Sequence, residues 1–188
     1  MANKNSIRAE MKQTLTKLSK PMYEDYSYKI ACRLFQEQIW KEAQVIGITI
    51  SKPPEVDTFQ IIRKAWELGK QVAVPKCHPK TKQLIFRNLT AFSQLESVFF
   101  ELLEPIEAIT KEVPANRMDL VLVPGLAYSI DGYRIGFGGG YYDRFLSSYS
   151  GCTVSLAFTE QIMAAIPTEE HDIPVERIIT PEKVLKVR

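Results

Sequence analysis

VPGLAYSIDGYRIGFGGGYYDRF, residues 123–145, is the stretch around which the rest of the chain is organised. An apolar run, Leu120–Val123, leads into it with the β-branched character of a buried strand. Residues 141–146 have the pattern of a short helix that leaves it. The order strand, glycine-rich loop, helix is therefore our first prediction for the fold.

The loop of this stretch has the composition of an anion site. Its glycines are Gly136, Gly138, Gly139 and Gly140, and the flanking arginines are Arg134 and Arg144. Glycine allows positive φ and leaves backbone N–H groups uncovered, so such a loop before a helix N-terminus forms a concave anion site. Arginine adds forked donors that suit phosphate or carboxylate. We predict a phosphate-binding loop; the alternative is a flexible surface turn.

The loop matches neither of the two standard nucleotide motifs. The dinucleotide fingerprint needs a third glycine where Tyr141 stands. The P-loop needs Gly-Lys-Ser/Thr where Tyr141, Tyr142 and Asp143 follow the glycines. A phosphate-binding loop of another lineage is the better interpretation.

Composition indicates a soluble intracellular protein of ordinary domain size. The chain has 188 residues, of which 45% are hydrophobic, and a formal net charge of +2. The near balance of charge does not favour nonspecific nucleic-acid binding. Three widely spaced cysteines argue against a disulfide framework and fit a reducing compartment. The N-terminus has no apolar signal core, and no window reaches the apolar length of a membrane span.

Hydrophobic periodicity predicts alternating helices and strands. We predict helices over residues 3–19, 21–40, 59–68 and 141–146, and strands over 45–50, 71–75, 84–89, 119–123, 153–158, 177–180 and 183–187. Residues 90–114 show loops and short elements without a sustained period. Alternation of this kind predicts an α/β fold, which we describe as one three-layer α/β/α domain over residues 1–188 with a largely parallel, Rossmann-like open sheet.

The residues around the loop favour a nucleoside triphosphate over a sugar phosphate or coenzyme A. Asp143 stands beside the loop, where a carboxylate can hold Mg²⁺ against phosphate oxygens or merely serve the helix dipole. The cations Lys4, Arg8, Arg134 and Arg144 exceed what one monophosphate needs, although Lys4 and Arg8 also fit a solvated helix face. Phe137, Tyr141 and Tyr142 can stack on a heterocycle or belong to the core.

A second candidate region follows the strand predicted over residues 45–50. Ligands of open α/β sheets bind outside the carboxyl ends of the strands, which singles out Ile50 and Glu55. Glu55 can equally serve as an acid near a helix N-terminus. Lys76, at the end of the next strand, is a further basic candidate. With only two histidines, no nucleophilic triad is indicated, so positioning and charge neutralisation are the expected catalytic style.

The stretches PGLAY, residues 124–128, and DGYRIGFGGGYYDR, residues 131–144, resemble the signature of the 5-formyltetrahydrofolate cyclo-ligase family. Residues 4–8, the pair Ile50 and Glu55, and residues 157–172 resemble further segments of that family. Residues 99–105 depart from it: related sequences often carry an aromatic-glycine pair before Glu-Pro, and here Glu101-Leu102-Leu103 stands there.

The resemblance implies an enzyme that uses ATP and Mg²⁺ to close 5-formyltetrahydrofolate to 5,10-methenyltetrahydrofolate, releasing ADP and phosphate through an iminium phosphate. It implies ATP binding by Lys4, Arg8, Arg134, Ile135, Gly136, Phe137, Gly138, Gly139, Gly140, Tyr141 and Tyr142. Catalytic roles fall to Arg134, Tyr142 and Arg144, folate contacts to Ile50, Glu55, Phe137 and Tyr141, and metal ligation to Asp143 and Asp172. We expect a cytoplasmic monomer whose partners are small-molecule substrates, with no nucleic acid or membrane.

Two rival functions stay open at this point. A noncatalytic sensor domain would bind a sugar phosphate or nucleotide through the glycine loop without turnover. A phosphosugar isomerase would use Asp143 or Glu55 as an acid or base. Neither rival explains the basic N-terminal segment.

Overall fold

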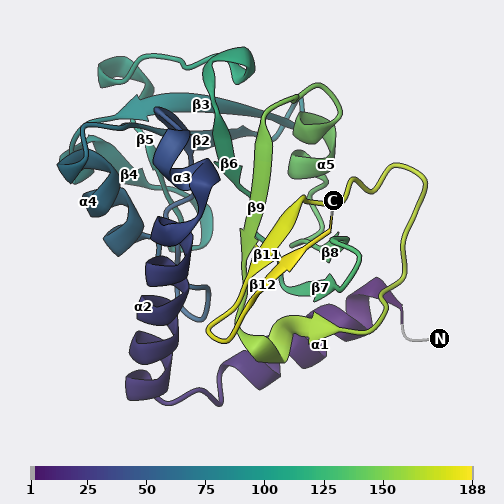
Figure 1. The fold of residues 1–188 in the computed structure, drawn as a ribbon. Coiled ribbons are helices and arrows are strands. Elements are labelled where there is room, and N and C mark those ends of the chain that lie inside the picture. The colour runs from purple at the N-terminus through teal and green to yellow at the C-terminus, as the bar shows by residue number, and fades with distance from the viewer. Residues whose placement is uncertain (1–2, 188) are drawn as a thin grey trace.

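A large, mostly parallel sheet lies at the centre of a mixed α/β fold (Figure 1), in a computed structural model that describes residues 3–187. The strand order is β12-β11-β9-β6-β1-β2-β3. Its strands are β1 (Val45–Gly47), β2 (Gln71–His78), β3 (Gln83–Leu89), β6 (Leu120–Leu122), β9 (Cys152–Leu156), β11 (Arg177–Ile179) and β12 (Val184–Lys186). The inner pairs are parallel, and the edge strands β3 and β12 are antiparallel to their neighbours. The predicted α/β class with a largely parallel sheet is confirmed.

The helices are α1 (Lys4–Leu15), α2 (Lys20–Gln36), α3 (Gln38–Glu42), α4 (Phe59–Glu67) and α5 (Tyr141–Leu146). Side chains begin the first two: the carboxamide of Asn3 accepts a hydrogen bond from the N–H of Ser6 (2.8 Å), and the hydroxyl of Ser19 accepts one from that of Met22. Helix α4 ends before Gly69, whose φ of +71° confirms the predicted stop. Within residues 3–187, none of the helices combines the length and the apolar character that crossing a bilayer requires.

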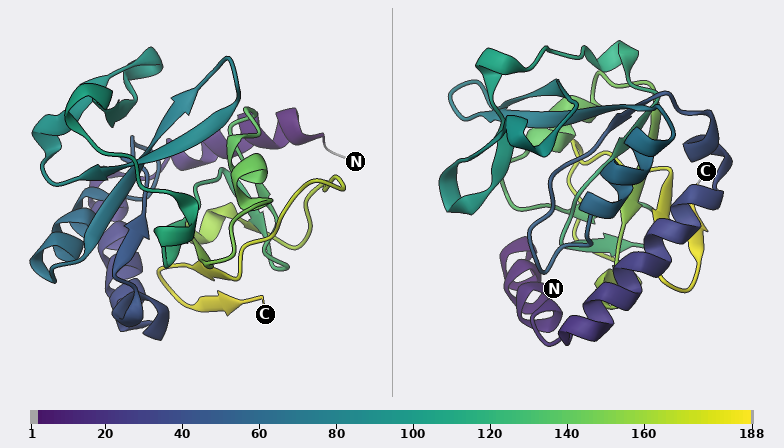
Figure 2. Two further views of the ribbon diagram at one scale, coloured as in Figure 1. Left: turned by 90° about the horizontal axis from the view of Figure 1, so that it is seen from above. Right: turned by 90° about the vertical axis from the view of Figure 1, so that its left-hand side faces the viewer.

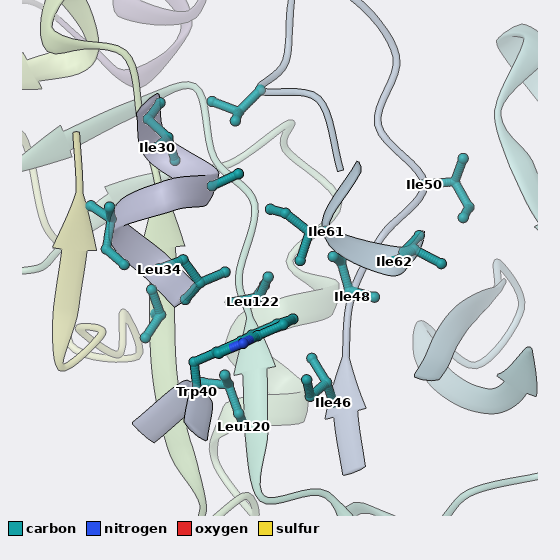
Figure 3. Packing of buried hydrophobic residues seen from close by; sticks show 14 of the residues in the cluster. Ile30, Leu34, Trp40, Ile46, Ile48, Ile50, Ile61, Ile62, Leu120 and Leu122 are labelled. Carbon is teal, nitrogen blue, oxygen red and sulfur yellow. The ribbon is translucent and has the colours of Figure 1, made fainter. Parts of the chain in front are cut away.

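One face of the sheet is covered by α2, α3 and α4. Alternate strand residues such as Ile46, Leu120 and Leu122 point to this face. They meet side chains of the three helices, among them Leu34 and the fully buried Trp40 (Figure 3). Each such large side chain contributes about 2–3 kcal/mol by leaving water, so this face carries most of the core.

The opposite face packs against α5 and the loops before β6. Val121 and Ala73 point to it, and Phe86 of β3 packs against Phe145 of α5 with the rings tilted by 45° and their centroids 4.9 Å apart. The two views in Figure 2 show α2 and α4 on one side of the sheet and α5 on the other. Strands buried on both faces read as continuous apolar runs, which is why their sequence signal was strong.

A hairpin separates β6 from the glycine loop, which corrects the predicted order of strand, loop and helix. It consists of β7 (Ala127–Ser129) and β8 (Arg134–Ile135), and its turn contains Gly132 with a φ of +84°. The short strand β10 (Ile162–Met163) pairs with β7 to complete a small second sheet. The glycine loop therefore leaves β8, not β6, and enters α5, whose predicted bounds are confirmed.

Other boundaries differ by a few residues. The helix predicted over 21–40 divides at Glu37, whose extended backbone (φ −66°, ψ 138°) turns the chain so that Trp40 reaches the core. The helix predicted over 3–19 ends at Leu15, and the strand predicted over 45–50 ends at Gly47. Strand β2 continues beyond Pro75 to His78 because its whole length pairs with β3, so Lys76 lies inside the strand.

Residues 90–114 form short elements, as predicted. These are the hairpin strands β4 (Leu95–Ser97) and β5 (Leu103–Pro105), with 3-10 turns at Phe92–Gln94, Phe99–Glu101 and Glu107–Ile109; further 3-10 turns lie at Ala115–Arg117 and Thr159–Gln161. The remaining strands lie inside their predicted ranges to within one residue.

Candidate active site

The strand order reverses between β1 and β6, and a cavity opens at the carboxyl ends of these two strands. From β1 the chain continues to β2 and β3 on one side of it. The later strands β6, β9 and β11 are added on its other side, so the direction of the strand order changes between β1 and β6. Reversal points of this kind are where open α/β sheets bind ligands. The residues that line the cavity are Thr49, Ser51, Glu55, Val56, Thr58, Leu122, Val123, Pro124, Gly125, Tyr128, Leu156 and Gln161.

Glu55 is the ionisable group of this cavity. Its Oε2 accepts a hydrogen bond from the N–H of Lys52 (3.0 Å), within a turn in which the N–H of Glu55 donates to the carbonyl of Lys52 (2.9 Å). Burial raises the pKa of Glu55, and the Lys52 N–H opposes this only in part. A partly desolvated carboxylate at a reversal point is a strong acceptor for a donor-rich ligand edge.

Ile50 lies beside this cavity but does not line it. Its side chain is 6% exposed and belongs to the main core cluster, at the edge of the group drawn in Figure 3. Ile50 therefore supports the cavity wall from behind. The predicted folate contact by Ile50 stays a prediction.

The glycine loop has the backbone geometry that its composition predicted. Gly138 and Gly140 have φ of +101° and +66°, conformations that side chains disfavour. A Cβ built at Gly136 would meet nothing within 4 Å, so the backbone there is open to a ligand. The loop thus exposes uncovered backbone immediately before the first turn of α5.

Arg134 of β8 links helix α5 to the chain near Ile173. Its side chain is 3% exposed. Nη1 donates to the carbonyl of Ile173 (2.7 Å), and Nη2 donates to Oδ1 of Asp143 (2.9 Å). Both ends of the guanidinium fork are therefore engaged, one by α5 and one by residues 169–173, which we call the acidic segment because they include Glu169, Glu170 and Asp172.

Helix α1 lies against the loop and carries Lys4 and Arg8, two cations for which ATP binding was predicted. It contacts β7 and the turn at Thr159–Gln161, and Figure 1 shows it below β7 and β8. Nε of Arg8 donates to the carbonyl of Gly136 (2.8 Å). Nζ of Lys4 lies 2.7 Å from Oδ2 of Asp172 and 3.1 Å from Oε1 of Glu169. The geometry excludes a purely solvated role for this helix face.

The acidic segment is tied to Lys4 through Asp172. Burial alone would raise the pKa of Asp172, but the hydrogen bonds from Lys4 and from the backbone N–H of Glu169 hold that pKa below its usual range. The pKa of Lys4 is raised in return: burial opposes this, and hydrogen bonds to Asp172 and Glu169 outweigh it. The pair fastens α1 to the segment that also accepts from Arg134.

The aromatic residues of the loop differ in exposure. Phe137 is 53% exposed, so its ring is available to a ligand. Tyr141 lies below Nζ of Lys82, 5.7 Å from the ring centroid. The hydroxyl of Tyr142 is buried without a hydrogen-bond partner among the described residues, and burial raises the pKa of Tyr142. Arg144 is exposed, and its Nη1 donates to the carbonyl of Gly139 (3.2 Å).

Asp143 keeps metal-binding capacity. Oδ1 accepts from Arg134, whereas Oδ2 accepts no hydrogen bond from residues 3–187, and the side chain is 25% exposed. In that same range no cluster of three or more acidic, histidine or cysteine side chains could hold a metal by itself. A metal that brings its own phosphate ligands needs only one or two carboxylates, so Asp143 suits Mg²⁺ held by a nucleotide.

Several cavity residues had not been singled out from the sequence. Tyr128, Thr58 and Gln161 line the cavity; Tyr128 and Gln161 lie in stretches that resemble the family, but the sequence analysis assigned no role to either, and Thr58 lies outside those stretches. The signal that could have found all three is position, since each stands near the carboxyl end of a central strand. Lys76, in contrast, donates to Oε1 of Glu96 (2.8 Å) and to the carbonyl of Pro105 (3.2 Å), which holds the β4–β5 hairpin on β2.

Comparison with known proteins places this site in a family. A family model described as the 5-formyltetrahydrofolate cyclo-ligase family matches residues 1–181. The chain is 34% identical over 146 residues to 5-formyltetrahydrofolate cyclo-ligase of Escherichia coli, covering 76% of this chain and 80% of that protein. It is 29% identical over 187 residues to the protein of that name from Mus musculus, covering 94% and 92%.

Solved structures agree. The structure of Aquifex aeolicus 5,10-methenyltetrahydrofolate synthetase matches with a TM-score of 0.87 and 26% identity over 98% of this chain and 93% of that chain. A synthetase of the same description from Mycoplasma pneumoniae, 20% identical over 96% and 99% of the two chains with a TM-score of 0.78, supports the fold alone. The family match extends over nearly all of the chain and includes both the glycine loop and the Lys4 helix, and the chain therefore belongs to the 5-formyltetrahydrofolate cyclo-ligase family.

Proposed function

We propose that this chain is an enzyme that closes 5-formyltetrahydrofolate to 5,10-methenyltetrahydrofolate at the expense of ATP, releasing ADP and phosphate. The observation that carries the proposal is one arrangement of contacts. Arg8 of α1 bonds to the glycine loop and Lys4 to the acidic segment, and Tyr128, which lines the cavity with Glu55, pairs in the β7–β8 hairpin with Arg134 at the start of the loop. An anion site and a carboxylate cavity side by side suit a reaction between a nucleotide and a donor-rich heterocycle.

In this proposal the triphosphate lies along residues 134–142. The backbone from Ile135 to Tyr142 supplies N–H donors, and Lys4 and Arg8 neutralise charge from above. Arg144 is exposed, so its guanidinium can turn from the carbonyl of Gly139 toward a phosphate. Arg134 acts from below as a positioning group, because both ends of its fork are already engaged.

Asp143 is the residue that we propose to hold Mg²⁺, with Asp172 as a second ligand. Oδ2 of Asp143 is available for this, whereas Oδ2 of Asp172 is already bonded to Lys4. When bound, the metal would neutralise phosphate charge that the cations of α1 do not reach. Arg134 holds Asp143 in place for this purpose.

The folate would enter the cavity with the edge of its pterin ring, and Phe137 and Tyr141 would flank it, with Ile50 behind the wall. Glu55 accepts hydrogen bonds from the N–H groups of the pterin. The formyl oxygen attacks the terminal phosphorus, the bond to ADP breaks, and an iminium phosphate forms. The neighbouring aminobenzoyl nitrogen then attacks the formyl carbon and gives up its proton to the departing phosphate or to water, and inorganic phosphate leaves with the former formyl oxygen. The protein contributes position and charge neutralisation.

We also propose that the chain works as a monomer in the cytoplasm and that residues 1–188 form one domain. A three-layer α/β/α architecture of the Rossmann-like open type is the finer description that we propose for it. The helices found on both faces of the sheet support that description.

One assay tests the proposed function. Purified protein is mixed with 5-formyltetrahydrofolate, ATP and Mg²⁺, and the methenyl chromophore is followed by absorbance. We expect product only when all three are present, together with one ADP per product. Nucleotide binding without product would favour the noncatalytic sensor, and a folded protein that forms no product in any combination would sink the enzyme proposal.

Replacement of Lys4 by alanine should raise the KM for ATP about tenfold and leave the KM for 5-formyltetrahydrofolate unchanged. The reason is that Lys4 holds α1 on the acidic segment through its ion pair with Asp172; loss of a partly buried ion pair costs about 1 kcal/mol, roughly a factor of five to ten. Lys12→Ala is the matched control, because Lys12 lies on the same helix with an exposed side chain. Equal ATP dependence in both variants would mean that the ion pair of Lys4 with Asp172 does not serve ATP binding.

Alanine substitutions at two glycines separate the shape of the loop from its contact with phosphate. Gly138→Ala should cost about 1–2 kcal/mol of stability, because alanine is strained at positive φ. Gly136→Ala should not alter stability, since its Cβ would meet no protein atom within 4 Å. If the triphosphate lies over this loop, that methyl group raises the KM for ATP about tenfold. Urea unfolding and initial rates distinguish the two effects; normal ATP kinetics in Gly136→Ala would place the phosphates elsewhere.

A further inference from the structure

Tyr128 places a buried hydroxyl in the cavity that contains Glu55. Its side chain lines that cavity, and the residue as a whole is 0% exposed. Its hydroxyl makes no hydrogen bond of standard geometry with any residue in the range 3–187. Burial raises the pKa of Tyr128, and the Ser155 hydroxyl lies close enough to oppose this slightly, but that hydroxyl donates to the carbonyl of Val123 (2.8 Å). An unpaired buried hydroxyl loses its bonds to water without replacement, and cavities keep such groups where a ligand completes them.

Two other polar side chains of the cavity, those of Thr58 and Gln161, are committed to the protein. The hydroxyl of Thr58 donates to the carbonyl of Thr49 (2.7 Å) and accepts from the N–H of Ser51 (2.9 Å). The amide of Gln161 donates to the carbonyl of Leu126 (3.0 Å), and its oxygen accepts from the N–H of Phe158 (2.8 Å). Two lining groups of complementary character keep unused capacity within the described chain: the Tyr128 hydroxyl, which is buried, and Oε1 of Glu55.

Gly125 has no side chain that could occupy the space next to the Tyr128 hydroxyl. A Cβ at this position would lie 3.0 Å from the hydroxyl oxygen of Tyr128, so any side chain here would close over it. The cavity measures about 40 Å³, which admits the edge of a ring system rather than the whole of it. Burial raises the pKa of Tyr128, so the phenol keeps its proton at neutral pH and can donate it.

We propose that Tyr128 determines specificity for the pterin edge by donating a hydrogen bond to its 4-oxo oxygen while Glu55 accepts from the adjacent N–H groups. This assignment rests on the proposed function. A carboxylate acceptor beside a hydroxyl donor is the complement of an N–H next to a C=O. The same pair would disfavour a ring that presents an amino group in place of the oxo group, because the hydroxyl would then lose the acceptor for its proton.

Tyr128→Phe tests the assignment, since it removes one oxygen atom and nothing else. Affinities for 5-formyltetrahydrofolate and for its 2,4-diamino counterpart are measured by calorimetry without ATP. We expect the variant to bind 5-formyltetrahydrofolate about five- to tenfold more weakly than the wild type, with the affinity for the diamino compound unchanged. The melting temperature of the ligand-free variant should stay equal or rise by about 2–4 °C, because an unpaired buried hydroxyl is removed.

Tyr149→Phe is the control with a paired hydroxyl. Tyr149 donates to the carbonyls of Met118 (3.2 Å) and Cys152 (3.3 Å), at the opposite end of β6 and β9. That variant should melt at a lower temperature and bind both ligands as the wild type does. A variant that loses affinity without losing stability has lost a ligand contact, as expected for Tyr128→Phe. A variant that loses stability without losing affinity has lost a structural contact, as expected for Tyr149→Phe.

Unchanged affinity of Tyr128→Phe for 5-formyltetrahydrofolate, or an equal loss for both ligands, would overturn the assignment. If the variant does not fold, the wild type decides: similar affinity for the two ligands overturns the assignment, and at least fivefold weaker binding of the diamino compound supports it. Failure of the proposed function looks different. In that case the wild type itself forms no methenyl product, whereas an active wild type with an indifferent Tyr128→Phe variant refutes the assignment alone.

Discussion

Arg134→Ala should unfold about 3 kcal/mol more easily than the wild type and lose more than a hundredfold in kcat/KM. The guanidinium is 3% exposed and binds both Asp143 and the carbonyl of Ile173. Removing one partner of a buried ion pair costs about 3–5 kcal/mol because the remaining charge stays desolvated. The 25% exposure of Asp143 places the cost at the lower end of that range. Activity falls because Asp143, the proposed metal ligand, and the acidic segment are no longer held in place by the hydrogen bonds of Arg134.

The measurement is urea unfolding combined with rates taken well below the melting temperature, so that loss of fold and loss of function are separated. Arg134→Lys is the control: an ammonium can bind Asp143 or Ile173 but cannot bridge them with a planar fork. We expect it to recover part of the stability and little of the activity. Wild-type stability in Arg134→Ala would mean that the guanidinium faces a ligand and not the protein.

This expectation differs from the role that the sequence suggests for Arg134. An arginine beside three glycines is typical of a phosphate contact, and such a contact implies little effect on stability. The difference arises from the hairpin β7–β8, which turns Arg134 inward beneath α5. Two strands of two and three residues are too short for periodicity to reveal them.

Long-range contacts mark the limit of prediction from one sequence. The central strands and α5 were predictable because buried parallel strands form unbroken apolar runs and glycines mark the start of the helix. The ion pair of Lys4 with Asp172 joins residues 168 positions apart. No local pattern encodes such a pair; only the resemblance to the family assigned functions to both residues.

In the cavity, too, one residue could be predicted from the sequence and another could not. Glu55 was predictable from its position after a central strand, whereas Tyr128 stands in the family-like stretch PGLAY without any role that its sequence context assigns to it. Its significance depends on Gly125 and on the satisfied bonds of its neighbours, and these are visible only in three dimensions. Sequence reasoning finds the residues whose type is unusual for their place, and it misses ordinary residues in unusual surroundings.

Glu55→Gln should lower kcat/KM for 5-formyltetrahydrofolate by about 10²–10³-fold and leave the KM for ATP unchanged. A carboxylate that accepts from two N–H groups is replaced by an amide that turns one donor toward them, which loses a charged hydrogen bond and leaves buried groups unpaired. Because burial raises the pKa of Glu55, the ionised side chain costs folding free energy. The variant should therefore be at least as stable as the wild type at pH 8.

The pH dependence follows with a definite sign. A carboxyl group whose pKa is higher in the folded state than in the unfolded state stabilises the fold at low pH, and this contribution disappears as pH rises through the folded value. The difference in unfolding free energy between Glu55→Gln and the wild type should therefore shrink as the solution is acidified. Affinity of the wild type for 5-formyltetrahydrofolate, measured without ATP, should fall over the same interval, because protonation removes the acceptor.

Glu37→Gln provides the opposite control. Oε2 of Glu37 lies 2.6 Å from Nη1 of Arg177, on the α2 side of the sheet. That variant should be less stable than the wild type. Its affinity for the folate should equal that of the wild type at each pH, because Glu55 is unchanged. If Glu55→Gln keeps the wild-type affinity and its pH dependence, the cavity at the β1–β6 reversal does not hold the pterin. The pterin would then have to bind beyond hydrogen-bond distance of Glu55. The proximity of the cavity to the glycine loop would in that case not explain the reaction.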